Sequence, residues 1–577
     1  MEVHRKKIRY QTSVVAVFLF LTFFFGGLSK ELGIPYITVT HQLLTGFSGF
    51  YLLIGLILSV KKLGTRSFVT RINFIAFFMF IIQIGIGYFI SRDPMNGWLL
   101  GAHYVLSVII FGLVVSVLSL EYSTDSKDKI QFKLSSSFSK HALLSIVFGI
   151  LVLVSGVYLS NFGIRESCAS WPLCHGGTLP SDANGWIVLI HRFVVGTVGI
   201  YLLWFNLQAW RKLRTQKVML TISNLFVVLF FAQGFIGALQ TVNGYPAYML
   251  IIHELTATLF VSLGFILLVL IGEKFSNEFE DIQEEIAPID WRQRIKDLIA
   301  LNKPIVVLLL LSTTVAGMII GGGKLPDADV LIITILGGFL AAGGSSAINQ
   351  YIDRDSDGKM TRTANRPIPS GRLTPAEGLA FGVTALVVAF YLFAGFINLL
   401  AALLALAGMA YYILLYSIYL KKRSVQNIVI GGGAGAIPPL VGWAAATGSL
   451  NLAAGFLFFI IFLWTPPHFW ALALLRKNEY AAAGIPMMPV KRGEAATRRL
   501  IFQYTIALFL TTLVMWFLNL AGWIFLVAAI GLGAYLVILA RQVLLNGRNR
   551  IYYRMYRHSN YYLLILFVFL AIDSVLL

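Results

Sequence analysis

Charged residues are scarce in this sequence. They make up 12% of the 577 residues, whereas 58% are hydrophobic and the mean hydropathy is +0.80. Soluble domains carry about twice this share of charge. The shortage of charge therefore excludes an ordinary water-soluble protein and indicates a polytopic membrane protein.

Cysteine is nearly absent too, because the chain contains only Cys168 and Cys174. Two lone cysteines disfavour a metal site built from thiolates. Both fall in a loop that the charge pattern places outside the membrane, where an oxidising compartment permits a disulfide. We therefore predict a Cys168–Cys174 disulfide.

The N-terminus lacks a small-residue cleavage site. Residues 1–10 are basic and precede an apolar run, as in a signal peptide, but nothing after the run is typical of processing. We interpret this segment as the first membrane anchor.

Apolar runs, by contrast, are abundant. About 20 apolar residues are enough to span a bilayer, and seventeen such runs can be counted, eight between residues 10 and 272 and nine between residues 303 and 577. The sequence therefore predicts an all-α membrane protein with about 17 transmembrane helices.

The net charge of +19 could indicate nucleic-acid binding. However, Lys and Arg cluster in alternate loops, which is the positive-inside pattern of a membrane protein. This pattern places the chain in the cell (cytoplasmic) membrane, in contact with lipid, with a cytoplasmic N-terminus and an external C-terminus. We expect no nucleic acid as a partner.

The first half contains an internal repeat. HQLLTGFSGFYLL from His41 recurs as HRFVVGTVGIYLL from His191 at an offset of 150 residues, and the same offset relates His103 to His253. A duplicated four-helix bundle follows, with one histidine near the outer end of the second and fourth helix of each copy. Paired imidazoles on facing helices commonly hold heme iron, although hydrogen-bonded packing is the alternative.

Glycines repeat together with the histidines. Four of them, Gly46, Gly49, Gly196 and Gly199, would allow close helix approach or leave room for a flat macrocycle. The repeated pairs are Gly26 and Gly156, Gly46 and Gly196, Gly49 and Gly199, and Gly87 and Gly237. The second copy also carries an insertion with both cysteines, CASWPLCHGG, which we expect to form a lid over the second copy's heme.

An acidic, polar stretch at residues 273–290 divides the chain. We predict a first domain at 1–272, a cytoplasmic linker at 273–290 and a second domain at 291–577. The stretch from Trp291 has an apolar helical stripe with cationic flanks, which is typical of an interfacial helix.

The densest polar cluster is NQYIDRDSDGKMTRTANRPIPSG, which begins at Asn349. Asn349, Asp353 and Asp357 recur every four residues and so share one helical face. Such oxygen ligands suit Mg²⁺, which bridges carboxylates to substrate phosphates. A solvated loop is the alternative, but carboxylates at the mouth of a membrane helix are costly and usually functional.

Cations that could bind a diphosphate surround this cluster in the sequence. They are Lys359, Arg362, Arg366, Lys422, Arg423, Arg476 and Lys491. Glu479 follows Arg476 and is a further candidate metal ligand and catalytic residue. His468, in TPPHFW, is either a contact for an incoming heme or a hydrogen-bonded core histidine.

The second half resembles the UbiA-type intramembrane prenyltransferases, through NxxxDxxxD, and in particular heme O synthase (protoheme IX farnesyltransferase), through MxRTxxRPxPSG and WTPPHFWAL. The resemblance implies a nine-helix bundle that uses Mg²⁺. It also implies transfer of a farnesyl group from farnesyl diphosphate to a vinyl group of heme b, which yields heme O. Glu479 stands where relatives carry Asp.

The first half resembles heme A synthase, through its eight helices, four repeated histidines and WPLC loop. This implies that it oxidises a methyl group of heme O to the formyl group of heme A. His191 and His253 would hold a heme b cofactor, and His41 and His103 the substrate. Relatives often carry a glutamate where this chain has Thr38, with Glu31 the nearest acid, and some carry a further cysteine pair in the first outer loop.

Three alternatives stay open. The second half could prenylate another acceptor such as a quinone precursor, the first half could be a diheme electron carrier, or the chain could be a transporter. An electron donor of unknown identity and terminal oxidase assembly factors are further candidate partners.

Overall fold

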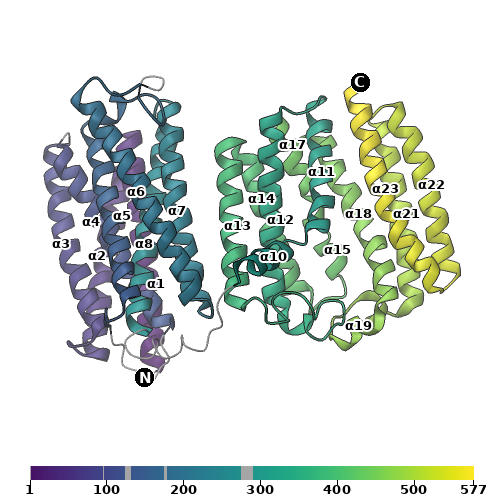
Figure 1. The fold of residues 1–577 in the computed structure, drawn as a ribbon, viewed down its shortest axis with the longest axis horizontal. Helices are drawn as coiled ribbons and strands as arrows, with labels where there is room; N and C mark the ends of the chain where they lie inside the picture. Colours follow the sequence, from purple (N-terminus) through teal and green to yellow (C-terminus); the bar gives the residue numbers. More distant parts are fainter. Residues whose placement is uncertain (1, 95, 124–131, 175–177, 275–289, 577) are drawn as a thin grey trace. The chain divides into compact units, whose positions relative to one another are not determined.

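The computed structural model describes residues 2–94, 96–123, 132–174, 178–274 and 290–576 (Figure 1). Within these ranges the protein is helical and has no strand, only an isolated bridge between Cys174 and Thr178. The described residues include seventeen helices long and apolar enough to cross a membrane. The all-α, seventeen-span prediction is therefore confirmed. The chain divides into two compact units, Met1–Pro288 and Ile289–Leu577.

The described part of the first unit contains eight long helices and a short 3-10 turn, Ile164–Ser167. Helices α1 to α4 form one bundle, and α5 to α8 form another. The two copies join where α4 packs against α8. The long helices are α1 (Glu2–Leu32), α2 (Pro35–Leu63), α3 (Phe68–Arg92), α4 (Gly97–Ser123), α5 (Ser137–Asn161), α6 (Ala183–Lys212), α7 (Lys217–Val242) and α8 (Ala247–Lys274).

The second unit begins with the amphipathic helix α10 (Trp291–Leu301), and ion pairs fix which side of this helix faces the protein. Its polar residues face the protein, since Arg294 pairs with Glu377 at 3.0 Å and Asp297 with Arg372 at 2.9 Å. Its apolar Ile295 remains 54% exposed. This outward apolar side is consistent with the predicted interfacial helix.

Nine spans follow α10, some of them interrupted. Proline and glycine break one span into three short helices, as their density in the sequence predicts. The elements are α11 (Pro304–Gly322), α12 (Ala328–Asp357), α13 (Pro375–Phe396), α14 (Leu399–Ala410) with a π-helical continuation (Tyr411–Leu420), α15 (Asn427–Gly431), α16 (Gly433–Ala436), α17 (Pro438–Thr447), α18 (Leu452–Leu475), α19 (Lys477–Ala482), α20 (Met488–Lys491), α21 (Gly493–Phe517), α22 (Trp523–Leu545) and α23 (Asn549–Leu576).

Glycine lets α11 and α17 approach closely. A Cβ at Gly317 would collide with the backbone carbonyl of Pro439, and one at Gly442 with the carbonyl of Thr314. These contacts position the broken span against the first span of the unit.

Candidate active sites

The carboxylates of the second unit lie at the end of α12. Asn349, Asp353 and Asp357 are 3%, 0% and 2% exposed. The Asn349 amide nitrogen donates to Asp353 Oδ2 at 2.8 Å, so these side chains do share a helical face. Two buried carboxylates are costly unless cations or metals accompany them.

Each carboxylate meets a cation, one from nearby in the sequence and one from a distant segment. Arg366 Nη1 lies 2.5 Å from Asp357 Oδ2. Lys421 Nζ forms an ion pair with Asp353 Oδ2. Arg366 was expected at this site from the sequence, whereas Lys421 was not.

The π-helical segment Tyr411–Leu420 explains why Lys421 is the residue that reaches Asp353. Ser417, within this wider turn, bonds to the carbonyl of Tyr412 five residues earlier and accepts from the Asn349 amide at 3.0 Å. Lys421 follows directly after the segment. π-helical turns occur often at functional sites, and this one brings both side chains to α12.

Lys303 is a third cation near the carboxylates that the sequence analysis did not single out. It precedes α11, is partly buried and has a φ of 48°, a left-handed conformation that a lysine rarely adopts. Burial lowers the pKa of Lys303 to about 7; Arg366 and Lys421 also lower it, whereas Asp357 and Asp353 oppose them. Three basic groups thus surround two carboxylates, an excess that suits an anionic ligand.

The donor set fits a Mg²⁺ ion shared with a substrate. Asp353 Oδ1 is buried and has no hydrogen-bond partner among the described residues. Asn349 uses its amide nitrogen for both of its hydrogen bonds, and its carbonyl oxygen can act as an acceptor. The described ranges contain no group of three or more His, Cys, Asp or Glu side chains that could hold a metal. Such an ion would therefore rely on two carboxylates, with substrate oxygens completing its coordination.

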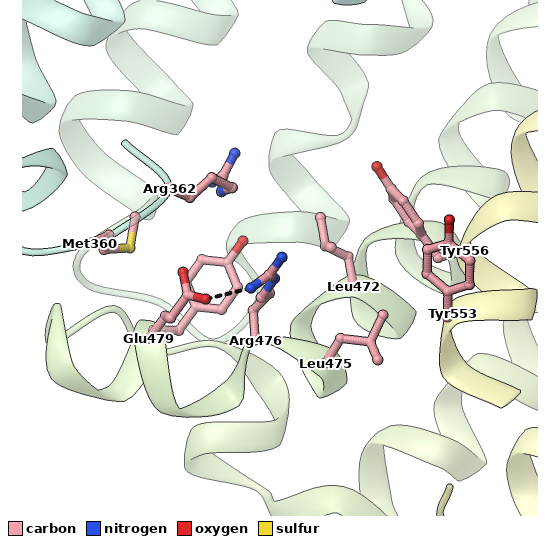
Figure 2. A pocket seen from close by; sticks show the side chains of 9 residues that line it. Met360, Arg362, Leu472, Leu475, Arg476, Glu479, Tyr553 and Tyr556 are labelled. Atoms are coloured by element: carbon pink, nitrogen blue, oxygen red, sulfur yellow. Dashed lines mark hydrogen bonds and ion pairs between the residues drawn. The ribbon is translucent and has the colours of Figure 1, made fainter. Parts of the chain in front are cut away.

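Glu479 lies in a neighbouring pocket instead of joining the two aspartates. This pocket has a volume of about 380 Å³ and receives side chains from the loop after α12, from α18, from α19 and from α23 (Figure 2). Glu479 pairs with Arg476 at 2.8 Å. The lining residues are Met360, Arg362, Leu472, Leu475, Arg476, Glu479, Tyr480, Tyr553 and Tyr556.

Tyr480 links this pocket to the carboxylate site. It interacts electrostatically with both Lys421 and Arg362, and burial raises the pKa of its phenol. The phenol therefore stays neutral near pH 7 and can donate a hydrogen bond.

The predicted diphosphate cations thus separate into three groups. Arg366 lies at the carboxylates, while Arg362 and Arg476 line the second pocket. The other four are exposed in the structure: Lys359, Lys422, Arg423 and Lys491.

His468 lies behind the second pocket and does not line it. Its Nδ1 contacts Ser559 Oγ at 2.8 Å, and its ring stacks between Trp464 and Tyr556 at 4.4 Å and 4.7 Å. The hydrogen-bonded core histidine fits these contacts.

The four histidines of the first unit form two pairs, one in each bundle. His103 interacts electrostatically with His41, and His253 with His191. The repeat therefore places two imidazoles near each other in each copy, as a bis-histidine heme site requires.

Hydrogen bonds orient one ring of each pair. His41 Nδ1 lies 2.8 Å from the carbonyl oxygen of Thr22, so it donates to that oxygen. His191 Nδ1 lies 2.8 Å from Ser155 Oγ, whose own proton goes to the carbonyl of Val152. Protonation at Nδ1 leaves Nε2 as the free lone pair, the form in which a histidine binds iron.

Repeated glycines form a seat for each histidine ring. A Cβ at Gly26 would lie 3.0 Å from His41 Cε1, and one at Gly156 would lie 3.4 Å from His191 Cε1. Gly87 and Gly237 stand in the same relation to His103 and His253, each at 3.3 Å. The repetition of glycines thus has a packing cause that the sequence alone did not reveal.

The glycines that follow His41 and His191 behave differently. A Cβ at Gly46 or at Gly196 would meet no atom within 4 Å, whereas one at Gly49 would lie 2.7 Å from Phe80. Gly46 and Gly196 are exposed, so neither serves helix packing within the described residues. The Gly49 position serves close helix packing.

The cysteine loop is attached to the helix of His191. Cys168 and Cys174 form a disulfide with Cα atoms 4.6 Å apart. Arg192 donates to the carbonyl oxygens of Cys168, Ser170 and Pro172 at 2.7 to 3.0 Å. The residue next to a predicted heme ligand therefore holds the loop in place. His175, beside Cys174, lies outside the described residues.

Acidic residues from two helices meet at Lys30, near the end of α1. Lys30 contacts Glu254 of α8 at 2.9 Å and Glu31 at 3.5 Å. Thr38, in the place of the relatives' glutamate, bonds to Ser29 at 2.6 Å. A carboxylate is therefore present beside the first copy, from α8 as well as from α1.

Comparisons with known proteins match each half of the chain to a different family. The model of the UbiA prenyltransferase family matches residues 310–564. The model described as cytochrome oxidase assembly protein matches residues 26–263.

Curated relatives extend across both halves. A protoheme IX farnesyltransferase of Roseiflexus castenholzii is 37% identical over 443 residues, which cover 73% of this chain and 81% of the relative. One of Gloeobacter violaceus is 47% identical over 284 residues, 49% of this chain and 93% of the relative. Among solved structures, a UbiA homolog from Archaeoglobus fulgidus bound to DMAPP and Mg²⁺ is 14% identical and covers 48% of this chain and 99% of that chain, with a TM-score of 0.38.

Proposed function

This chain belongs to the protoheme IX farnesyltransferase family, and we propose that its two units catalyse consecutive steps of heme A biosynthesis in a multi-pass membrane protein. The second unit makes heme O from heme b and farnesyl diphosphate. The first unit, whose sequence matches a cytochrome oxidase assembly family, oxidises a methyl group of heme O to the formyl group of heme A.

The observation that carries the transferase assignment is the buried face of Asn349, Asp353 and Asp357, with Arg366 and Lys421 paired to its carboxylates and the basic Lys303 nearby. Lys303, Arg366 and Lys421 bind the diphosphate of the prenyl donor at this face. Exposed Lys359, Lys422, Arg423 and Lys491 attract the anion to the mouth of the bundle.

The reaction breaks the bond between C1 of the farnesyl group and its diphosphate oxygen. A vinyl carbon of heme b forms the new bond to C1, water adds to the neighbouring carbon, and a proton is released, which leaves a hydroxyethylfarnesyl group. Asp353 and Asp357, with Asn349, would hold Mg²⁺, which would supply positive charge against the charge that develops on the departing diphosphate. Lys421 and Arg366, both partly buried, stabilise the same charge, because electrostatic interactions are stronger away from water. Glu479 is a further candidate metal ligand if substrate binding brings α19 to the aspartates.

In the first unit, His191 and His253 hold a heme b cofactor, and His41 and His103 hold the heme O substrate. The Nδ1 hydrogen bonds of His41 and His191 support this proposal, since they present Nε2 for ligation. A bound heme b supplies redox chemistry there. The disulfide loop, fastened by Arg192, covers the outer side of the second copy's site.

The charge pattern supports a cell-membrane location with a cytoplasmic N-terminus and with the carboxylate site at the cytoplasmic side. Heme b and farnesyl diphosphate would then both arrive from the cytoplasmic side. An electron donor and terminal oxidase assembly factors are candidate partners of the first unit.

Pigment extraction after expression in a host that lacks heme O tests the whole proposal. Heme O together with heme A is expected. Heme O alone would show that the first unit is only an electron carrier. A prenylated quinone precursor without either heme would overturn the transferase assignment.

A further inference from the structure

The pocket around Arg476 is separate from the carboxylate site that serves the diphosphate. None of Asp353, Asp357, Arg366 and Lys421 lines it. Its walls combine two guanidinium groups with leucine, methionine and tyrosine side chains (Figure 2). This mixture suits a ligand with a flat apolar body and acidic substituents.

The charge in this pocket is available to a ligand. Arg362 is exposed, and the side chain of Arg476 is 50% exposed beside Glu479. One carboxylate against two guanidinium groups leaves a net positive charge. Guanidinium groups bind carboxylates with two parallel hydrogen bonds, which makes them selective for such ligands.

Stacked aromatic rings outside the pocket hold Tyr556 in place. Tyr556 stacks on His468, which stacks in turn on Trp464. Ser559 accepts from His468 through its hydroxyl and from the Trp464 indole through its carbonyl, the latter at 2.7 Å. Such a preorganised aromatic wall can receive a planar ring at little cost in entropy.

We propose that this pocket binds the acidic edge of the tetrapyrrole acceptor, with Arg362 and Arg476 paired to its two propionates and Tyr553 and Tyr556 against its ring. His468 is a positioning residue that orients Tyr556. The inference rests on the proposed function, because that function makes heme b the acceptor. The vinyl groups of heme b lie on the edge opposite the propionates, so anchoring the propionates here turns the reactive edge into the bundle. Tyr480 then separates the acceptor's acids from the diphosphate at Lys421.

The test compares protoheme with its dimethyl ester as acceptors for the full chain, with heme O or its ester as the measured product. The wild-type enzyme should prefer the diacid by at least about tenfold, as loss of charge-assisted hydrogen bonds predicts. Arg362→Gln and Arg476→Gln should each raise the KM for protoheme by about tenfold. They should leave the KM for farnesyl diphosphate within about twofold and reduce the preference for the diacid.

Arg541→Gln is the matched control, since Arg541 is exposed at the end of α22, outside the pocket. It should change neither KM. If the arginine variants raise the KM for farnesyl diphosphate and keep the preference for the diacid, the pocket binds the diphosphate and the proposal is wrong. Absence of prenylated heme in the wild type would instead overturn the proposed function itself.

The role of His468 is tested separately. His468→Phe retains an aromatic ring for stacking and should keep the KM for protoheme near the wild-type value, whereas His468→Ala should raise it. Equal defects in both variants would show that the imidazole itself is required, which contradicts a positioning role.

Discussion

Lys421 and Asp353 form an ion pair between the end of the π-helical segment and the last turns of α12. The same Asp353 oxygen accepts from the amide of Asn349, so two donors meet at Oδ2, while Oδ1 has no partner in the described part of the chain. This division leaves one buried carboxylate oxygen for a metal ion and one for protein contacts.

We expect Asp353→Ala and Asp357→Ala each to reduce heme O formation by about 100-fold or more, because each removes a charge that positions metal and diphosphate. The heme b content of the first unit should not change. Asp355→Ala is the control, since the Asp355 side chain is 82% exposed. Product extraction measures the outcome, and near-normal transfer by either site variant would remove the metal-diphosphate assignment.

Lys421→Gln should raise the KM for farnesyl diphosphate and lower kcat more strongly than Lys422→Gln. The first residue touches Asp353, and the second is exposed one position further along. Losing this cation should cost about 10-fold or more in kcat/KM, because the buried carboxylate of Asp353 would lose its partner. Equal effects of the two variants would show that the ion pair has no special part in binding.

Substitution of His191 or His253 by Ala should remove the low-spin heme b of the purified protein. Substitution of His41 or His103 should spare that heme and block conversion of heme O. His141→Ala is the control, because His141 bonds to Tyr201 outside both pairs. Absorption spectra decide this, and loss of all heme from the His41 variant alone would show that the roles of the two copies are exchanged.

Gly87→Val should disturb the first copy's site, because a Cβ there would already lie 3.3 Å from His103 Cε1. The ratio of heme A to heme O should fall several-fold while heme b is retained. Gly85→Val, two residues away on α3, should have little effect, since a Cβ at Gly85 meets no atom within 4 Å. An unchanged ratio in the Gly87 variant would contradict the inference that Gly87 makes room for the His103 ring.

Cys168→Ser and Cys174→Ser should weaken heme retention before they affect global folding. A ring this short contributes at most about 2–3 kcal/mol through chain entropy, and Arg192 still holds the loop. Mass spectrometry of alkylated protein, prepared without reductant from an oxidising compartment, tests the bond. Two free thiols in active enzyme would overturn a structural role for it.

The sequence alone determined the features that depend on local order along the chain. Seventeen spans follow from apolar runs of sufficient length, because an unpaired backbone in lipid is too costly for any other arrangement. The shared face of Asn349 and Asp357 follows from helical periodicity. The two histidine pairs follow from the repeat, since equivalent sequences fold into equivalent bundles.

The tertiary structure alone decided which cations meet the carboxylates. A helix turns by about 100° per residue. The sequence Lys421, Lys422 and Arg423 therefore does not show which side chain points towards the carboxylates, because this depends on the π-helical turn before it. Lys303 joins the site from another helix junction. Arg362 lines a different pocket from the site of Arg366, although the two are only four positions apart in the sequence. These outcomes depend on how helices distant in sequence rotate and pack against one another, which local periodicity does not encode.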